Sequence, residues 1–271
     1  MLQEKVNHQD HPSATDAIDV ERLKRELLDN GYVVLRGMID RQRLAEHTAQ
    51  LFDEFDRLNN DGPLFSGGGG MIMGHLNCFP GQQTRFVYET LEQRGIIDLI
   101  RSLWPKAARM PNVGCNFNLP GSSAQNYHMD GYAADAFPII NIASVDTDQV
   151  NGSLDVLERT HLRPYRYWEI VAQRPRSIRL PLSQGDVMIR SSMLWHRGMP
   201  NRSSRARPML ALTWEDGGSS LADPYTKNEG KLTFYPNRYT TNWVGRCKEH
   251  AYVLAPRLGA TARFAVSLFK E

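Results

Sequence analysis

The sequence has 271 residues, of which 41% are apolar and 23% charged, a composition typical of a globular protein in water. Its net charge of +2 gives no reason to expect a nucleic acid or a membrane surface as a partner. No apolar run reaches the length of a membrane span, and the polar N-terminus lacks the apolar centre of a signal peptide. Cys78, Cys115 and Cys247 are too far apart in sequence to suggest a disulfide framework or a zinc ribbon, so we expect a cytoplasmic protein.

The N-terminal third of the chain predicts helices. Residues 1–15 carry no periodic pattern and are predicted to be a disordered tail, followed by a single domain over residues 16–271. A helix capped by Asp16 or Asp19 is expected to end at Asn30-Gly31. A strand at 32–35 then leads to a second helix capped by Asp40.

Two further segments complete this helical part. The glycine run at 66–70 lacks the Lys-Ser/Thr of a phosphate-binding loop and predicts a mobile connection. A third helix is expected over 88–104, where apolar residues recur at helical spacing.

From residue 112 the pattern changes to short runs rich in Val, Ile, Phe and Tyr, separated by Gly, Pro, Asn and Asp. Such spacing predicts an antiparallel sandwich or barrel. Helices followed by strands indicate an α+β, mainly β fold in which helices buttress a sheet. The expected strands are 113–119, 125–130, 137–145, 153–158, 177–182, 186–191 and 207–214.

Two polar residues in this region suggest a metal site. His128 and Asp130 are two positions apart, so on a strand their side chains would point to the same face. His196 follows an apolar strand, and two sheets packed face to face could bring it opposite this pair. Two imidazoles and one carboxylate with open positions suit non-haem Fe(II). His-x-Asp sequences also occur as plain solvated or hydrogen-bonded pairs, so the motif alone is a weak signal.

An arginine follows the second histidine at a useful distance. If residues 196–200 and 207–213 were neighbouring strands, Arg207 could enter the same cavity and bind a carboxylate through two parallel hydrogen bonds. It could equally be a surface residue, and spacing alone does not separate it from Arg205.

The chain resembles the phytanoyl-CoA dioxygenase family of Fe(II)/2-oxoglutarate-dependent oxygenases. The matching segments, in the family's order, are LLDNGYVVLRGMID (27–40), QNYHMDGY (125–132), DQVNGSLDVLERTH (148–161) and LSQGDVMIRSSMLWHRGMPNRSSRARP (182–208). The resemblance implies a double-stranded β-helix, a cupin-like jelly roll with helices packed outside. It also implies that Fe(II), 2-oxoglutarate and O2 are used, with release of succinate and CO2.

By this resemblance His128, Asp130 and His196 bind iron, and Arg207 rather than Arg205 holds the distal carboxylate of 2-oxoglutarate. Related halogenases lack the carboxylate, so Asp130 favours hydroxylation or another oxidation over halogenation.

Two positions depart from the family pattern. Arg197-Gly198 stand where many members have a small residue followed by Ser, which removes a hydroxyl partner of the cosubstrate. Asn141 stands where relatives often place a tryptophan that lines the cosubstrate pocket.

Other polar residues are candidates by position. Asn116 and Asn118 share one face of a strand, and Asn116 is our candidate for the other carboxylate of the cosubstrate, although closing the following turn explains these residues equally well. Asn126 and Tyr132 flank the His128/Asp130 pair at period two and are candidates for substrate contact.

We therefore expect an oxygenase that hydroxylates an aliphatic C–H of a small polar or carbohydrate-like metabolite. Arg190, Arg197 and Lys231 could accept an anionic substrate, or could be ordinary surface cations. A zinc-dependent hydrolase and a non-catalytic jelly-roll module that binds a small molecule remain the alternatives.

Overall fold

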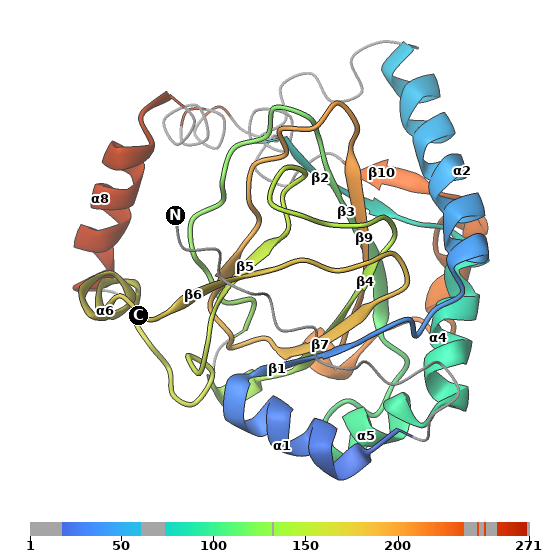
Figure 1. Ribbon diagram of the computed structural model, residues 1–271, viewed down its shortest axis with the longest axis horizontal. Helices are drawn as coiled ribbons and strands as arrows, with labels where there is room; N and C mark the ends of the chain where they lie inside the picture. Colours follow the sequence, from blue (N-terminus) through green and yellow to red (C-terminus); the bar gives the residue numbers. More distant parts are fainter. Residues whose placement is uncertain are drawn as a thin grey trace, which may run out of the picture.

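The computed structural model describes residues 18–60, 74–131, 133–235 and 254–269, together with positions 243 and 247 (Figure 1). The predicted tail at 1–15 and the predicted loop at 66–70 lie outside these residues. The α-helices are α1 (Val20–Asn30), α2 (Arg41–Asn60), α4 (Arg85–Gln93), α5 (Ile96–Leu103), α6 (Tyr167–Gln173) and α8 (Pro256–Ser267). The strands are β1 (Tyr32–Leu35), β2 (His75–Phe79), β3 (Asn112–Asn118), β4 (Pro138–Ala143), β5 (Leu154–Leu157), β6 (Ser177–Leu180), β7 (Val187–Ser191), β8 (His196–Arg197), β9 (Arg207–Thr213) and β10 (Thr233–Tyr235).

The strands form two antiparallel sheets that face each other. The larger has the order β1-β7-β4-β9-β3-β2-β10, and the smaller has the order β6-β5-β8. Apolar side chains fill the space between them: Ala143, Met188 and Met209 come from the large sheet, and Val156 from the small one. The predicted antiparallel sandwich is thus confirmed, and its interior is the place where inward-facing polar residues can meet.

Alternation along each strand separates this interior from a second core outside the large sheet. Ile140, Ile142, Val187 and Ile189 belong to that outer core, whereas the intervening side chains point inward. Helices α1, α2, α4 and α5 lie along the large sheet in Figure 1 and cover this outer face. The prediction of buttressing N-terminal helices is therefore confirmed.

The N-terminal helix forms where its capping residues predict it. Asp19 accepts a hydrogen bond from the backbone N–H of Arg22 at 2.9 Å, which satisfies a donor left free at the helix start. Gly31 ends the helix with φ of 85°, a left-handed conformation that glycine adopts without steric cost. Asp40 caps α2 in the same way through the N–H of Arg43 at 2.7 Å.

Two predicted elements differ in the structure. The single helix expected over 88–104 is two helices, because Gly95 takes a left-handed φ of 75° and breaks the apolar periodicity between α4 and α5. The strand expected at 125–130 is an extended segment joined to β8 by one isolated bridge, between His128 and His196.

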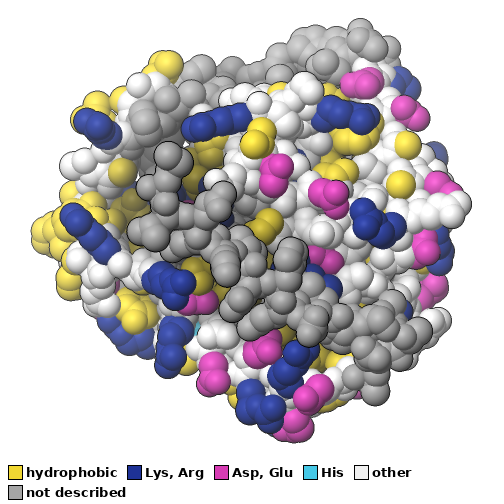
Figure 2. All heavy atoms as spheres, in the orientation of Figure 1, with side chains coloured by type: hydrophobic (Ala, Val, Ile, Leu, Met, Phe, Trp, Pro, Cys, Tyr) yellow, Lys and Arg dark blue, Asp and Glu magenta, His cyan; other side chains and the backbone are white. Residues whose placement is uncertain are grey.

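The segments after residue 160 hold further elements that the sequence reading did not predict. Helices α6 and α8 pack against each other on the flank of the small sheet, opposite the other helices (Figure 1). Figure 2 shows positive and negative side chains interspersed on the visible face, with apolar ones gathered on the flank of α8, where Leu258, Val266 and Phe269 are exposed. None of the described helices combines the length and the apolar character needed to cross a bilayer.

Candidate metal centre

Two histidines meet inside the sandwich through direct backbone pairing. The N–H of His128 donates to the carbonyl of His196, and the reverse bond is equally short, both at 2.9 Å. Their ring centroids are 4.4 Å apart. The expectation that the histidines would face each other across two sheets is wrong: they are neighbours in one layer, because the 125–130 segment extends the small sheet beyond β8.

Backbone carbonyls fix the orientation of both rings. Nδ1 of His128 donates to the carbonyl of Asn126 at 2.8 Å, and Nδ1 of His196 donates to that of Leu194 at 2.9 Å. Because a carbonyl can only accept, each neutral ring carries its proton on Nδ1 and presents the Nε2 lone pair. This is the usual arrangement of a metal-binding histidine.

The carboxylate of Asp130 lies against both Nε2 atoms. Oδ1 is 3.7 Å from Nε2 of His128, and Oδ2 is 3.4 Å from Nε2 of His196. Ligand atoms of the three residues all lie within 4.8 Å of one another, and among the described residues this is the group that could hold a metal ion. The donor set of two imidazoles and one carboxylate fits non-haem Fe(II) with positions left open.

The surroundings of His196 and Asp130 favour the protonation states that bind a cation, a neutral imidazole and an ionised carboxylate. Burial lowers the pKa of His196 from 6.5 to about 3, so its ring is neutral near pH 7. Burial opposes ionisation of Asp130, but His196 and Arg190 outweigh it and hold the pKa of this carboxyl well below its ordinary value. The Arg190 guanidinium, which donates to Oδ2 of Asp130 at 2.7 Å, is the permanent positive charge beside this carboxylate.

A row of polar residues crosses the large sheet at the same level. Antiparallel register places Arg207 beside Asn118, and Asn118 beside His75, on three adjacent strands. The amide of Asn118 donates to the carbonyl of Met199 at 3.0 Å, three residues after His196. The row therefore faces the segment that carries the second histidine.

Arg207 itself is 2% exposed and has no carboxylate partner among the described residues. Its Nη2 donates to the carbonyl of Gly152 at 3.2 Å, and its buried Nε has no hydrogen-bond partner. The expectation that β8 and β9 would be neighbouring strands is wrong, because β8 pairs with β5 in the small sheet and β9 lies in the large one. Arg207 enters the interior from the opposite sheet instead.

The remaining candidates from the sequence have different surroundings. Asn116 donates to the carbonyl of Leu76 at 3.4 Å, and Asn141 accepts from Nε of Arg190 at 3.0 Å. Asn126 contributes its backbone carbonyl to His128. Tyr132 lies outside the described residues.

A buried carboxylate that was not predicted from the sequence links the two segments that carry the histidines. Asp155 on β5 accepts from the hydroxyl of Tyr127 at 2.8 Å and from Nε of Arg197 at 2.9 Å. These two residues directly precede His128 and follow His196, and the Arg197 guanidinium lies 4.1 Å from the Tyr127 ring centroid. A charged residue at an otherwise apolar strand position was the available signal for Asp155, and also for Arg190.

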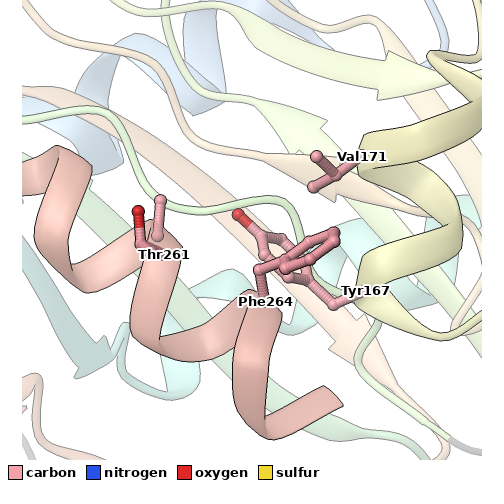
Figure 3. A pocket seen from close by; sticks show the side chains of 5 residues that line it. Tyr167, Val171, Thr261 and Phe264 are labelled. Atoms are coloured by element: carbon pink, nitrogen blue, oxygen red, sulfur yellow. The ribbon is translucent and has the colours of Figure 1, made fainter. Parts of the chain in front are cut away.

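An apolar cavity of about 290 Å³ lies elsewhere, between α6 and α8. Figure 3 shows Tyr167 and Val171 of α6 facing Thr261 and Phe264 of α8. The residues lining this cavity include no metal-binding side chain, and it is separate from the histidine pair.

Comparison with known families assigns the chain. The family model described as phytanoyl-CoA dioxygenase (PhyH) matches residues 27–209, a span that includes His128, Asp130, His196 and Arg207. The chain belongs to the phytanoyl-CoA dioxygenase family. The predicted family is thus confirmed, on a match that covers most of the chain.

Solved structures share the fold of this phytanoyl-CoA dioxygenase family member. AviO1 from Streptomyces viridochromogenes has a TM-score of 0.56 at 15% identity, over 73% of this chain and 96% of its own. The epimerase SnoN, solved with Fe3+, alpha-ketoglutarate and nogalamycin RO, has a TM-score of 0.54 at 18% identity, over 72% and 82%. The alpha-ketoglutarate-dependent carbocyclase SnoK has a TM-score of 0.53 at 15% identity, over 76% and 86%. The predicted cupin-like jelly roll is confirmed by these neighbours.

Proposed function

We propose that this protein is an Fe(II)- and 2-oxoglutarate-dependent oxygenase that hydroxylates an aliphatic C–H of a small polar or carbohydrate-like metabolite. The observation that carries the proposal is the convergence of His128, Asp130 and His196, whose ligand atoms all lie within 4.8 Å of one another. Family membership supports a dioxygenase over the zinc hydrolase and the non-catalytic module. The SnoN and SnoK neighbours are described as an epimerase and a carbocyclase, so the outcome at the substrate is a separate question.

In this proposal His128, His196 and Asp130 hold Fe(II) through their Nε2 atoms and one carboxylate oxygen. Oxidation of the C–H bond is chemistry that iron, 2-oxoglutarate and oxygen supply when bound. The contribution of the chain is to orient the donors: the carbonyls of Asn126 and Leu194 fix the two rings.

Arg207 is the proposed partner of the distal carboxylate of 2-oxoglutarate. A buried guanidinium without a counterion is costly unless a ligand supplies one. Nε of Arg207, Nδ1 of His75 and Oδ1 of Asn118 are buried and have no hydrogen-bond partner within the described part of the chain. Their position in one row supports a polar ligand at this place.

The space that a hydroxyl residue after the second histidine would need is occupied. A Cβ added at Gly198 would lie 2.9 Å from Oε1 of Gln125 and 3.0 Å from Cε1 of His75. Gln125 in turn accepts a hydrogen bond from the N–H of Gly198 at 2.8 Å. These two side chains fill the space that a serine would need, so they take its place beside the cosubstrate pocket in our proposal.

The inward-facing surface supports a polar substrate. Asn77, Asn116 and Asn141 lie on the same face of the large sheet as Arg207, where amides can exchange hydrogen bonds with hydroxyl groups. The cations considered for an anionic substrate are engaged: Arg190 pairs with Asp130, Arg197 with Asp155, and Lys231 with Glu229. An uncharged, hydroxyl-rich metabolite therefore fits better than an acyl thioester.

Anaerobic titration with Fe(II) and 2-oxoglutarate tests the proposal. We expect a weak visible absorption band, and on admission of oxygen we expect succinate formation that a panel of polyhydroxylated metabolites stimulates. His196→Ala should abolish both signals, whereas His161→Ala, outside the cluster, should retain them. A protein that hydrolyses substrates with Zn2+ in the absence of oxygen, or gives no band with Fe(II), would contradict the assignment.

A further inference from the structure

Arg190 is a buried cation inside the sandwich with two anchoring contacts. It lies on β7 and is 5% exposed. Nε donates to Oδ1 of Asn141 on the adjacent strand β4 at 3.0 Å, and Nη2 donates to Oδ2 of Asp130 at 2.7 Å. Nη1 is buried and has no hydrogen-bond partner among the described residues.

The two carboxylate oxygens of Asp130 have different surroundings. Oδ2 accepts a charge-assisted hydrogen bond from a guanidinium that Asn141 holds in place. Oδ1 has no guanidinium against it; it lies 3.7 Å from Nε2 of His128, while Oδ2 lies 3.4 Å from Nε2 of His196. A divalent cation bound to Oδ2 would lie close to the positive charge of Arg190, whereas one bound to Oδ1 would be farther away.

We propose that Arg190 is a positioning residue. Its hydrogen bond to Oδ2 of Asp130 keeps that oxygen from binding the metal, which is therefore bound through Oδ1 alone. The inference rests on the proposed function of the site. Carboxylates can also chelate a metal through both oxygens, which would use one more coordination position. By holding Oδ2, the Asn141–Arg190 pair leaves that position for the cosubstrate or oxygen.

The positioning role of Arg190 can be tested without turnover, with Co(II) as the probe. The visible spectrum of bound Co(II) depends on the coordination number of the site. The variants are Arg190→Met, Arg190→Lys and Asn141→Ala, with Arg36→Met as the matched control. Arg36 also pairs with a buried aspartate, Asp186, but at the edge of the sandwich between β1 and β7. Each protein is loaded with Co(II), its spectrum is recorded, and 2-oxoglutarate is titrated by calorimetry.

We expect Arg190→Met to change the Co(II) spectrum and to weaken 2-oxoglutarate binding about tenfold or more, in the range seen when groups that orient metal ligands are removed. Arg190→Lys, which keeps a cationic donor, should restore part of the affinity, and Asn141→Ala should give an intermediate loss. Arg36→Met should lower thermal stability yet keep the wild-type spectrum and affinity.

A wild-type spectrum and wild-type 2-oxoglutarate affinity in Arg190→Met would overturn the inference. Should that variant fail to fold, Arg190→Lys and Asn141→Ala decide: wild-type spectra and affinities in both would overturn the inference equally. Failure of the proposed function looks different. In that case the Co(II)-loaded wild-type protein itself would not bind 2-oxoglutarate, or would bind it equally well after His196→Ala.

Discussion

Replacing Arg207 by Met should make the metal-free protein more stable, and should weaken the binding of 2-oxoglutarate to the metal-loaded protein. The side chain is 2% exposed, and among the described residues its hydrogen-bond partner is the carbonyl of Gly152. A cation held in this way without a counterion opposes folding. Methionine has similar length and no charge, so it can fill the same space.

The size of the gain follows from the pKa of Arg207. Burial lowers this pKa from 12.5 to about 10, and at about 1.4 kcal/mol per pKa unit the buried charge costs roughly 3 kcal/mol. Loss of the hydrogen bond to Gly152 takes back about 1 kcal/mol. The free energy of unfolding should therefore rise by about 2 kcal/mol, which corresponds to roughly 5 °C in Tm for a protein of this size.

The loss of affinity should be larger. Two charge-assisted hydrogen bonds to a carboxylate contribute about 3 kcal/mol or more together, so the Kd for 2-oxoglutarate should rise about 100-fold. Chemical denaturation of the metal-free protein measures the first effect, and calorimetry on Co(II)-loaded protein measures the second.

Arg205→Met is the matched control, because Arg205 is exposed and lies over the ring of Phe52. It should leave both quantities unchanged. The reasoning fails if Arg207→Met lowers the stability of the metal-free protein by more than about 1 kcal/mol and spares cosubstrate affinity. If only Arg205→Met weakened the binding of 2-oxoglutarate, Arg205 rather than Arg207 would be the residue that binds its carboxylate.

Three further changes test other parts of the structure. Gly152→Ala, at φ of 87° and with its Cβ 2.5 Å from the carbonyl oxygen of Met199, should lower the free energy of unfolding by about 1 kcal/mol or more in urea titrations, and should weaken 2-oxoglutarate binding. Asp155→Asn should cost about 3 kcal/mol and lower Co(II) affinity about tenfold, measured by denaturation and calorimetry. Burial lowers the pKa of His47 below 6.5, so the unfolded chain takes up a proton first and stability should fall as pH drops below 6.5; His47→Gln should flatten that profile.

Local signals were sufficient for several features of this protein. Asp19 and Gly31 mark the ends of α1 through capping chemistry that depends on adjacent residues only. The same holds for His128 and Asp130, whose two-residue spacing placed both side chains on one side of an extended segment. The ligand role of these residues stays a proposal, but their closeness in space was predictable.

Long-range pairing was not predictable in the same way. The short strand β8 pairs with β5, forty residues upstream, and not with β9, which follows it in the chain. Nothing in residues 196–213 encodes that choice, because sheet membership depends on which distant strand offers a free edge and a matching apolar face. The break at Gly95 did carry a local signal, although apolar periodicity on both sides concealed it.

The charges inside the sandwich connect metal and cosubstrate binding on the proposed assignment. Arg190 balances Asp130 before any ligand arrives, whereas Arg207 has no counterion among the described residues, so the interior carries about one excess positive charge. A divalent metal raises that excess, and the dianion 2-oxoglutarate lowers it again with one carboxylate at the metal and one at Arg207. Bound metal should therefore strengthen the binding of 2-oxoglutarate. By thermodynamic linkage, 2-oxoglutarate should strengthen metal binding by the same factor. Arg207→Met removes the excess charge while leaving the metal ligands in place, and should therefore reduce this mutual factor.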